Sequence, residues 1–264
     1  MAPLRIRSEK NKIQLTDGIL IPEKEENSFF SAWRISFIGA IILLVVLPII
    51  SPSTYWDIIK FLPDGILNTF IVTVCSILAA SVIGLIAGLG RISRNTIINR
   101  IATIYIEVIR GIPLLVQLFY IYYALGKIVQ VPRMTAAVIA MSICYGAYMG
   151  EIFRAGILSI HKGQMEAALA LGMSRSQAMR KVILPQTFRV ILPPIGNEFI
   201  ALLKDSSLVS ILAVSDLLRR GREFASATFQ YFETYTVVAL VYLVLTLFFS
   251  RLVGIMEEKL TRNG

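Results

Sequence analysis

The chain has 264 residues, of which 56% are hydrophobic, and its mean hydropathy is +0.71. A soluble domain of this length would not carry so much apolar surface, so the composition indicates a polytopic membrane protein. The 26 Lys and Arg outnumber the 17 Asp and Glu, and basic cytoplasmic loops explain this excess of +9 better than nucleic-acid binding does.

Cysteine and histidine argue against metal chemistry in this chain. Cys75 and Cys144 lie inside apolar runs without metal-ligand spacing, and we interpret them as buried small hydrophobic residues. His161 is the single histidine, so neither a histidine-based metal cluster nor a histidine-dependent triad is expected.

Residues 1–34 are polar and mixed in charge, and they end with Phe29, Phe30 and Trp33, which suit a membrane interface. Ile35–Ile50 is apolar and uncharged and predicts a first transmembrane helix. It is not a cleaved signal peptide, because the preceding tail is too long and no small-x-small site follows. Ser51–Asp64 is then expected to form a short external loop.

The run Gly65–Gly90 is long enough to span a bilayer. Ala80, Gly84 and Gly88 recur at every fourth position, which predicts a face that another helix can approach closely. Arg91, Arg94 and Arg100 follow and indicate the cytoplasmic side.

Two further spans are predicted, Ile101–Ala124 and Met134–Ile157, and each contains a Glu-x-x-Arg pair toward its cytoplasmic end. Residues one turn apart share a helix face. We therefore expect Glu107 with Arg110, and Glu151 with Arg154, to form a structural ion-pair cluster. Gly111 and Pro113 predict a kink whose freed carbonyl must find a partner.

The polar stretch Gly163–Pro185 predicts two short helices joined by a sharp turn. Gly172 is placed where a helix C-cap favours left-handed backbone, and Ser174 with Gln177 has the spacing of a capping box. Pro185 is expected to close the second helix.

Val190–Val214 is apolar but is broken by Lys204, Asp205, Ser206 and Ser207, which is typical of a membrane helix that lines a cavity or ends short. Ser215–Phe232 is amphipathic, and Tyr235–Phe249 is the last predicted span before a charged tail.

Six spans place both termini on one side. With that side in the cytoplasm, the loop between the first two spans leaves only Lys60 outside. Arg219, Arg220 and Arg222 are the exception, because this topology puts them outside or in a re-entrant segment.

Four motifs carry a family resemblance. Glu166-Ala167-Ala168, three residues, Gly172, nine residues and Val182-x-Leu184-Pro185 resemble the EAA loop of ABC-importer permeases, with Val182 in place of isoleucine. Arg110–Gln117 is similar to the RGTPLLVQ segment of the polar amino acid uptake branch, with Ile112 in place of threonine. Gly196–Phe199 and Lys204–Leu208 resemble that branch too, so the likeness covers Asp64 to about Glu258.

The resemblance implies an all-α type I ABC-importer permease fold with about six transmembrane helices, five in the core and one added at the N-terminus. The implied division of the chain is a cytoplasmic tail (1–34), an extra helix and external loop (35–56), a permease domain (64–256) with coupling loop 161–185, and a cytoplasmic tail (257–264). The implied location is the bacterial inner membrane, with both termini cytoplasmic.

The resemblance also implies roles and partners. The EAA loop would dock on two copies of a cytoplasmic ATP-binding subunit through Glu166, Ala167, Ala168, Gly172 and Pro185. ATP and magnesium would be held by that subunit, with no cofactor on this chain, which contains no phosphate-binding G-x-x-x-x-G-K-S/T loop. A second permease subunit, identical or homologous, and an extracytoplasmic solute-binding protein would complete the importer, without nucleic acid.

The substrate would be a polar amino acid or an opine. The residues that we name as candidates for its path are Arg110, Gln117, Asn197, Glu198, Lys204, Asp205 and Ser206. These residues could instead hold helices together, and their mixed charge leaves both a cationic and an acidic substrate open.

Two other classes of protein stay in view. A secondary transporter or channel could show an inverted repeat, and none is visible in the sequence. A membrane enzyme could use Glu107, Glu151 or Glu198, but the chain shows no nucleophile–base pair or metal-ligand set. ATP dependence and product formation, respectively, separate these readings from an importer.

Overall fold

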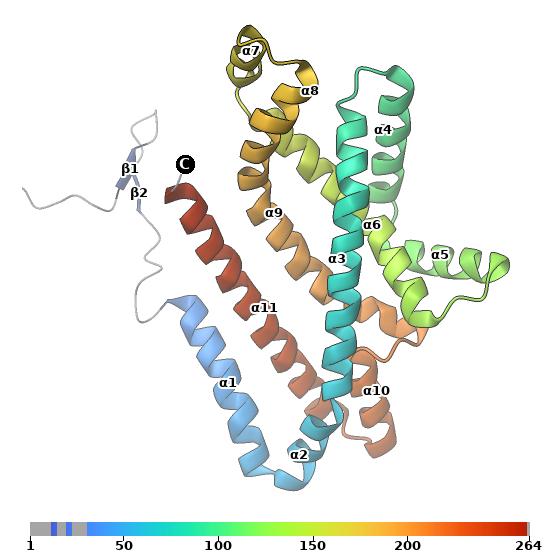
Figure 1. The fold of residues 1–264 in the computed structure, drawn as a ribbon. Helices are drawn as coiled ribbons and strands as arrows, with labels where there is room; N and C mark the ends of the chain where they lie inside the picture. The colour runs from blue at the N-terminus through green and yellow to red at the C-terminus, as the bar shows by residue number, and fades with distance from the viewer. Residues whose placement is uncertain (1–11, 15–19, 23–30, 263–264) are drawn as a thin grey trace, which may run out of the picture.

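The computed structural model describes residues 12–14, 20–22 and 31–262. Phe29 and Phe30 lie outside the described residues, as does most of the expected N-terminal tail. A short antiparallel pair, β1 (Lys12–Gln14) and β2 (Leu20–Pro22), precedes a helical bundle (Figure 1).

The first six helices of the bundle are α1 (Ala32–Ile50), α2 (Pro52–Phe61), α3 (Pro63–Arg91), α4 (Thr96–Gly111), α5 (Leu114–Ile128) and α6 (Arg133–Ser159). The remaining elements are α7 (Lys162–Ala170), α8 (Arg175–Ala178), a π-helical turn (Met179–Ile183), α9 (Leu184–Asp205), a 3₁₀ turn (Ser206–Leu212), α10 (Leu217–Thr228) and α11 (Tyr231–Arg262).

Four segments of the described chain are long and apolar enough to cross a membrane: α1, α2 continued by α3, α6, and α11. The broken pair α4 and α5 makes a fifth if both count as one span. The sequence prediction of about six also counts α9, which packs against α6 and α11 but does not meet the same criterion.

The centre of the bundle is the contact between α3 and α6. A Cβ atom added at Gly84 would collide with Met149 and lie 2.9 Å from the backbone nitrogen of Gly150, and one at Gly88 would lie 2.7 Å from the Gly150 carbonyl oxygen. Ala80 is fully buried on the same face. The predicted small-residue face therefore exists, and it lets the two backbones approach closely.

The two cysteines differ from the prediction that both are buried. Cys144 is buried on α6, whereas Cys75 is exposed on the outer face of α3. An apolar run in a membrane helix does not distinguish the buried face from the outward one, because lipid-facing positions are apolar too.

The predicted kink at Gly111 and Pro113 is a break, at which α5 turns by 112° from α4. The amide nitrogen of Gln117 donates to the carbonyls of Ile109 and Ile112, both at 2.6 Å. The thiol of Cys144 on α6 donates to the Gln117 side-chain oxygen at 2.9 Å. The carbonyls freed by the break thus have a partner, as buried backbone groups require.

The expected external loop at 51–64 is wrong, because most of it is helix α2. Pro52 is in the first turn of α2, where its missing N–H costs nothing. Ile58 and Leu62 are buried against Leu217, Val237 and Val238, which form a second apolar core between α2, α10 and α11. An amphipathic pattern with interfacial aromatic residues fits both a loop and a short surface helix, and the packing decides between them.

The last helix is longer than the predicted span 235–249. Helix α11 continues to Arg262, so residues 257–262 of the expected tail are helical, whereas residues 263–264 lie outside the described residues. Lys and Arg do not break a helix, and a long helix can carry its charged end beyond the membrane.

Candidate functional site

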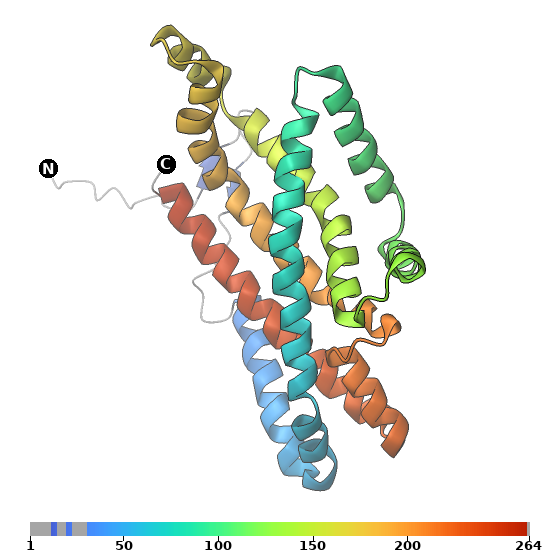
Figure 2. The same ribbon diagram turned by 45° about the vertical axis from the view of Figure 1, so that its right-hand side comes forward.

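The segment joining α6 to α9 forms a two-helix projection at one end of the bundle, opposite α2 and α10 (Figures 1 and 2). The side chain of His161 caps α7 by accepting a hydrogen bond from the backbone of Gly163 at 3.1 Å. At the other end of α7, Met173 N–H donates to the Ala168 carbonyl and Gly172 N–H to that of Leu169. This is the Schellman motif, and Gly172 occupies its left-handed position with φ +82°.

The second arm begins as the sequence indicates. Ser174 and Gln177 form a complete capping box, each side chain bonded to the other's backbone. Pro185, however, does not close the helix. A π-helical turn widens the chain just before it, so its missing N–H falls in the first turn of α9, where proline is tolerated.

The projection presents both charge and apolar surface. Glu166 and Ala167 are exposed, while Ala168 is buried against the second arm. Leu171, just before the turn, is 81% exposed, and Leu169 is 41% exposed. An exposed leucine at the tip of an ordered, doubly capped turn is surface that could be covered by a partner.

An ion-pair cluster lies between α3, α4 and α6. Glu151 pairs with Arg154 over 2.5 Å and with Arg91 over 2.7 Å, and Arg91 reaches Glu107 at 3.4 Å. The expected Glu107–Arg110 pair is wrong. Arg110, in the last turn of α4, instead places its guanidinium 5.5 Å from the ring centre of Tyr148. Helix spacing permitted both partners, and the close approach of α3 brought Arg91 nearer to Glu107.

A second polar cluster gathers residues from α4, α6 and α9. The hydroxyl of Tyr145 donates to Asp205 at 2.8 Å, and the rings of Tyr145 and Tyr148 lie 5.8 Å apart. Glu198, half-buried on α9, is electrostatically coupled to both Arg110 and Asp205. Three of the predicted substrate-path residues, Arg110, Glu198 and Asp205, therefore belong to one mixed-charge cluster.

The other four candidates are placed differently. Gln117 is buried and holds the α4–α5 break, and the Ser206 hydroxyl is buried and bonded to the Leu203 carbonyl at 2.8 Å. Asn197 and Lys204 are exposed on α9. Gln117 and Ser206 thus satisfy backbone groups.

The three arginines of α10 have partners within the chain. Arg219 pairs with Glu223 at 2.8 Å, and the guanidiniums of Arg219 and Arg222 donate to the Ser210 carbonyl of the 3₁₀ turn. Arg220 stacks on the ring of Phe61 at 4.0 Å and reaches Asp64 at 3.4 Å. Their positive charge fixes α10 to its neighbours.

Asp216 begins α10, in the connection outside the membrane-spanning helices. Its carboxylate accepts hydrogen bonds from the backbone N–H groups of Leu218 and Arg219. Burial raises the pKa of Asp216 to about 6, although those hydrogen bonds and nearby Arg222 act to lower it.

Sequence reasoning missed Tyr145, Tyr148 and the role of Arg91 as a shared partner. The tyrosines lie three residues apart on α6, and so on one helix face, which is the signal in the sequence that could have identified them. An arginine directly after an apolar run, such as Arg91, indicates the cytoplasmic side and is also placed to meet carboxylates on adjacent helices.

Comparison with known proteins agrees with this geometry. A family model for the binding-protein-dependent transport system inner membrane component matches residues 80–262. The glutamine transport system permease protein GlnP of Escherichia coli (strain K12) is 41% identical over 211 residues, which cover 79% of this chain and 96% of GlnP. The arginine transport system permease protein ArtQ of Bacillus subtilis (strain 168) is 37% identical over 207 residues, 78% of this chain and 94% of ArtQ.

The fold is shared with a solved structure as well. A chain in the crystal structure of an amino acid ABC transporter with histidines superposes with a TM-score of 0.74 at 41% identity, covering 78% of this chain and 97% of that chain. On the matched residues, the fold and the identity to permease proteins, this chain belongs to the family of binding-protein-dependent transport system inner membrane components.

Proposed function

We propose that the chain is the permease subunit of an ATP-driven importer of polar amino acids, located in the bacterial cytoplasmic membrane with both termini in the cytoplasm. The observation that carries this proposal is the ordered, exposed projection α7–Gly172–α8, which is continuous with two helices of the bundle, α6 and α9. A force applied to the projection would reach both helices that hold the polar cluster.

The coupling follows from that connection. Exposed Glu166, Ala167 and Leu171 would seat in a groove of an ATP-hydrolysing partner, two copies of which would serve a pair of permease subunits. ATP and magnesium would be bound by the partner. Closure of the partners would favour one of two arrangements of the bundle, because a ligand shifts an equilibrium only through its different affinity for the two states.

The polar cluster supports an amino acid as the substrate. A zwitterion presents an ammonium and a carboxylate, and the cluster offers carboxylates from Glu198 and Asp205 beside the guanidinium of Arg110. The relatives differ in the amino acid of their names, glutamine for GlnP and arginine for ArtQ, so the class of substrate transfers more readily than its identity. An extracytoplasmic binding protein would deliver it at the end that contains α2 and α10.

The coupling proposal is tested by variants in the projection. Glu166→Lys reverses the exposed charge, and Gly172→Glu forces a bulky residue into left-handed backbone. Both variants should insert in the membrane but lose ATP-driven uptake. Gly172→Asn should retain most of it, because asparagine tolerates that backbone conformation.

The matched control for Glu166→Lys is Asp57→Lys, a charge reversal at an exposed position of α2 at the other end of the molecule. It should leave copurification with the ATPase unchanged. Full uptake by both Glu166→Lys and Gly172→Glu would rule out the projection as the coupling element.

A further inference from the structure

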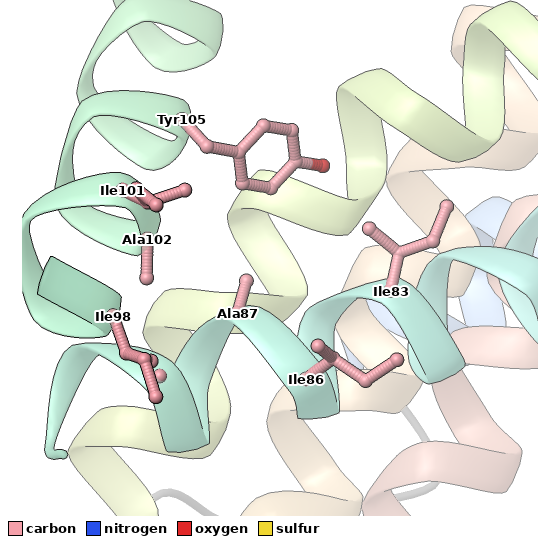
Figure 3. Close-up of a pocket in the computed structure, with 8 residues that line it drawn as sticks. Ile83, Ile86, Ala87, Ile98, Ile101, Ala102 and Tyr105 are labelled. Atoms are coloured by element: carbon pink, nitrogen blue, oxygen red, sulfur yellow. The ribbon is translucent and has the colours of Figure 1, made fainter. Parts of the chain in front are cut away.

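An apolar hollow of about 480 Å³ lies between α3 and α4 (Figure 3). Ile83, Ile86, Ala87 and Gly90 line it from α3, and Ile98, Ile101, Ala102 and Tyr105 from α4. Its floor consists of small residues, since a Cβ atom at Gly90 would already lie 3.0 Å from the Cβ of Ala102. The hollow is therefore a crevice between two helices in direct contact.

Among the described residues, no side chain that lines the crevice has a polar group left without a hydrogen-bond partner. The one polar side chain, Tyr105, donates its hydroxyl to the Ile143 carbonyl on α6 at 2.6 Å, and so presents only its ring. The isoleucines at the mouth are outward-facing, with Ile86 69% and Ile101 64% exposed. An occupant must be apolar and must reach the crevice from the membrane.

The shape of the crevice suits a hydrocarbon chain better than a helix. Packed helices lie roughly 8–10 Å apart, and α3 and α4 already make that contact, so a third helix cannot enter between them. From Ile83 to Gly90 the crevice follows α3 for about 10 Å. That length is most of one leaflet of a hydrocarbon core of roughly 30 Å.

Basic charge stands at the end of the crevice. The connection from α3 to α4, Ile92–Asn95, closes that end, and it carries the exposed Arg94. Arg91, directly before it, is engaged by Glu151 and Glu107, whereas no hydrogen bond or ion pair of Arg94 is found among the described residues. An apolar crevice that ends at an exposed guanidinium complements a molecule with an anionic head and a hydrocarbon tail.

We propose that the α3–α4 crevice binds one anionic phospholipid, with an acyl chain against Ala87 and Ala102 and the headgroup phosphate at Arg94. The crevice lies at the end of the bundle that contains α7 and α8, beside the Arg91–Glu151 cluster. A lipid there would fill the outer side of the α3–α4 contact, at the end of the bundle that carries the α7–Gly172–α8 projection.

The experiment is native mass spectrometry of the purified permease complex. Equal amounts of phosphatidylglycerol and phosphatidylcholine with identical acyl chains are supplied, and the bound lipids are counted. The wild type should retain one phosphatidylglycerol in preference to phosphatidylcholine. Arg94→Gln should lower that preference about fivefold, the attraction expected for one basic residue near an anionic lipid, and Arg133→Gln, an exposed arginine elsewhere, should not.

Two variants on α4 test the crevice itself. Ile101→Asn places an amide in the lining, whereas Ile104→Asn makes the same change at a position of similar exposure, 61% against 64%, outside it. Loss of the retained lipid in Ile101→Asn alone supports the site. Equal loss in both, or retention in both, overturns it in favour of ordinary lipid contact. Disulfide cross-linking between two copies through Ile101→Cys would also overturn it, since the crevice would then face a protein.

Discussion

The hydroxyl of Tyr145, in the middle of α6, donates a 2.8 Å hydrogen bond to the carboxylate of Asp205, at the end of α9. The ring of the same tyrosine lies 5.8 Å from that of Tyr148, tilted by 43°, and the Tyr148 ring lies under Arg110 of α4. Three helices thus meet through one chain of polar contacts, at the point where α4 breaks and α9 tightens into a 3₁₀ turn.

Removing the hydroxyl in Tyr145→Phe should raise the half-saturation concentration for uptake about tenfold. A hydrogen bond to a charged group contributes roughly 1.5–3 kcal/mol, and without it Asp205 is no longer held in place. Tyr148→Phe is the control, because it keeps the aromatic ring under Arg110 and leaves the hydrogen bond from Tyr145 to Asp205 intact. An equal change in both variants, measured as uptake of a labelled amino acid into proteoliposomes, would contradict a specific role for the Tyr145–Asp205 bond.

Gln117→Glu should destabilise the permease by about 2 kcal/mol or more. The carboxylate cannot donate to the Ile109 and Ile112 carbonyls, and an unsatisfied buried acceptor costs roughly 1–3 kcal/mol. The melting temperature of the purified complex in detergent measures the effect. Cys144→Ala removes only a weak thiol donor to the same side chain and should change the melting temperature much less. A Gln117→Glu complex as stable as the wild type would mean that the break needs no such partner.

Gly84→Ala should reduce the yield of folded protein, whereas Gly39→Ala should not. The added methyl group at position 84 collides with Met149, while the one at position 39, on α1, meets nothing within 4 Å. Overpacking of this kind costs roughly 1–3 kcal/mol. The measurement is the amount of monodisperse protein that each variant yields in gel filtration. Similar yields would show that α3 and α6 can separate without loss.

Asp216 should make stability depend on pH. The buried carboxyl has its pKa raised from 3.8 to about 6, so the folded state holds the proton more tightly than the unfolded state. Its stabilising contribution is fully present below about pH 4 and is lost as pH rises through 6, a difference of about 3 kcal/mol. The melting temperature of the wild type should therefore fall between pH 5 and 7 when it is compared with that of Asp216→Asn. Parallel pH profiles for the two proteins would contradict the raised pKa.

Local rules predicted the local geometry well. The left-handed Gly172, the Ser174–Gln177 capping box, the small face of α3 and the break before α5 each depend on a few neighbouring residues. Partners across the bundle were predicted less well. The spacing allowed Glu107 to pair with Arg110, but the close approach of α3 placed Arg91 beside Glu107 instead. The hydrogen bonds of Gln117 to the carbonyls of Ile109 and Ile112 were likewise not predicted.

Pro185 and α2 show the same limit. Proline usually ends a helix, yet a π-helical turn absorbed it, and amphipathic residues at 52–61 became a packed helix only because α10 and α11 offered a surface. The fold class followed from composition and periodicity. The polar cluster of Arg110, Tyr148, Tyr145, Asp205 and Glu198 required three helices to be placed against one another first.

The most direct test of the account is amino acid-stimulated ATP hydrolysis in proteoliposomes. The chain would be coexpressed with a candidate ATP-hydrolysing subunit and assayed with a candidate solute-binding protein and each amino acid in turn. We predict that a subset of polar amino acids stimulates hydrolysis and that Glu166→Lys abolishes this stimulation. Failure to copurify with any ATPase, or hydrolysis that no amino acid changes, would contradict an ATP-driven amino acid importer.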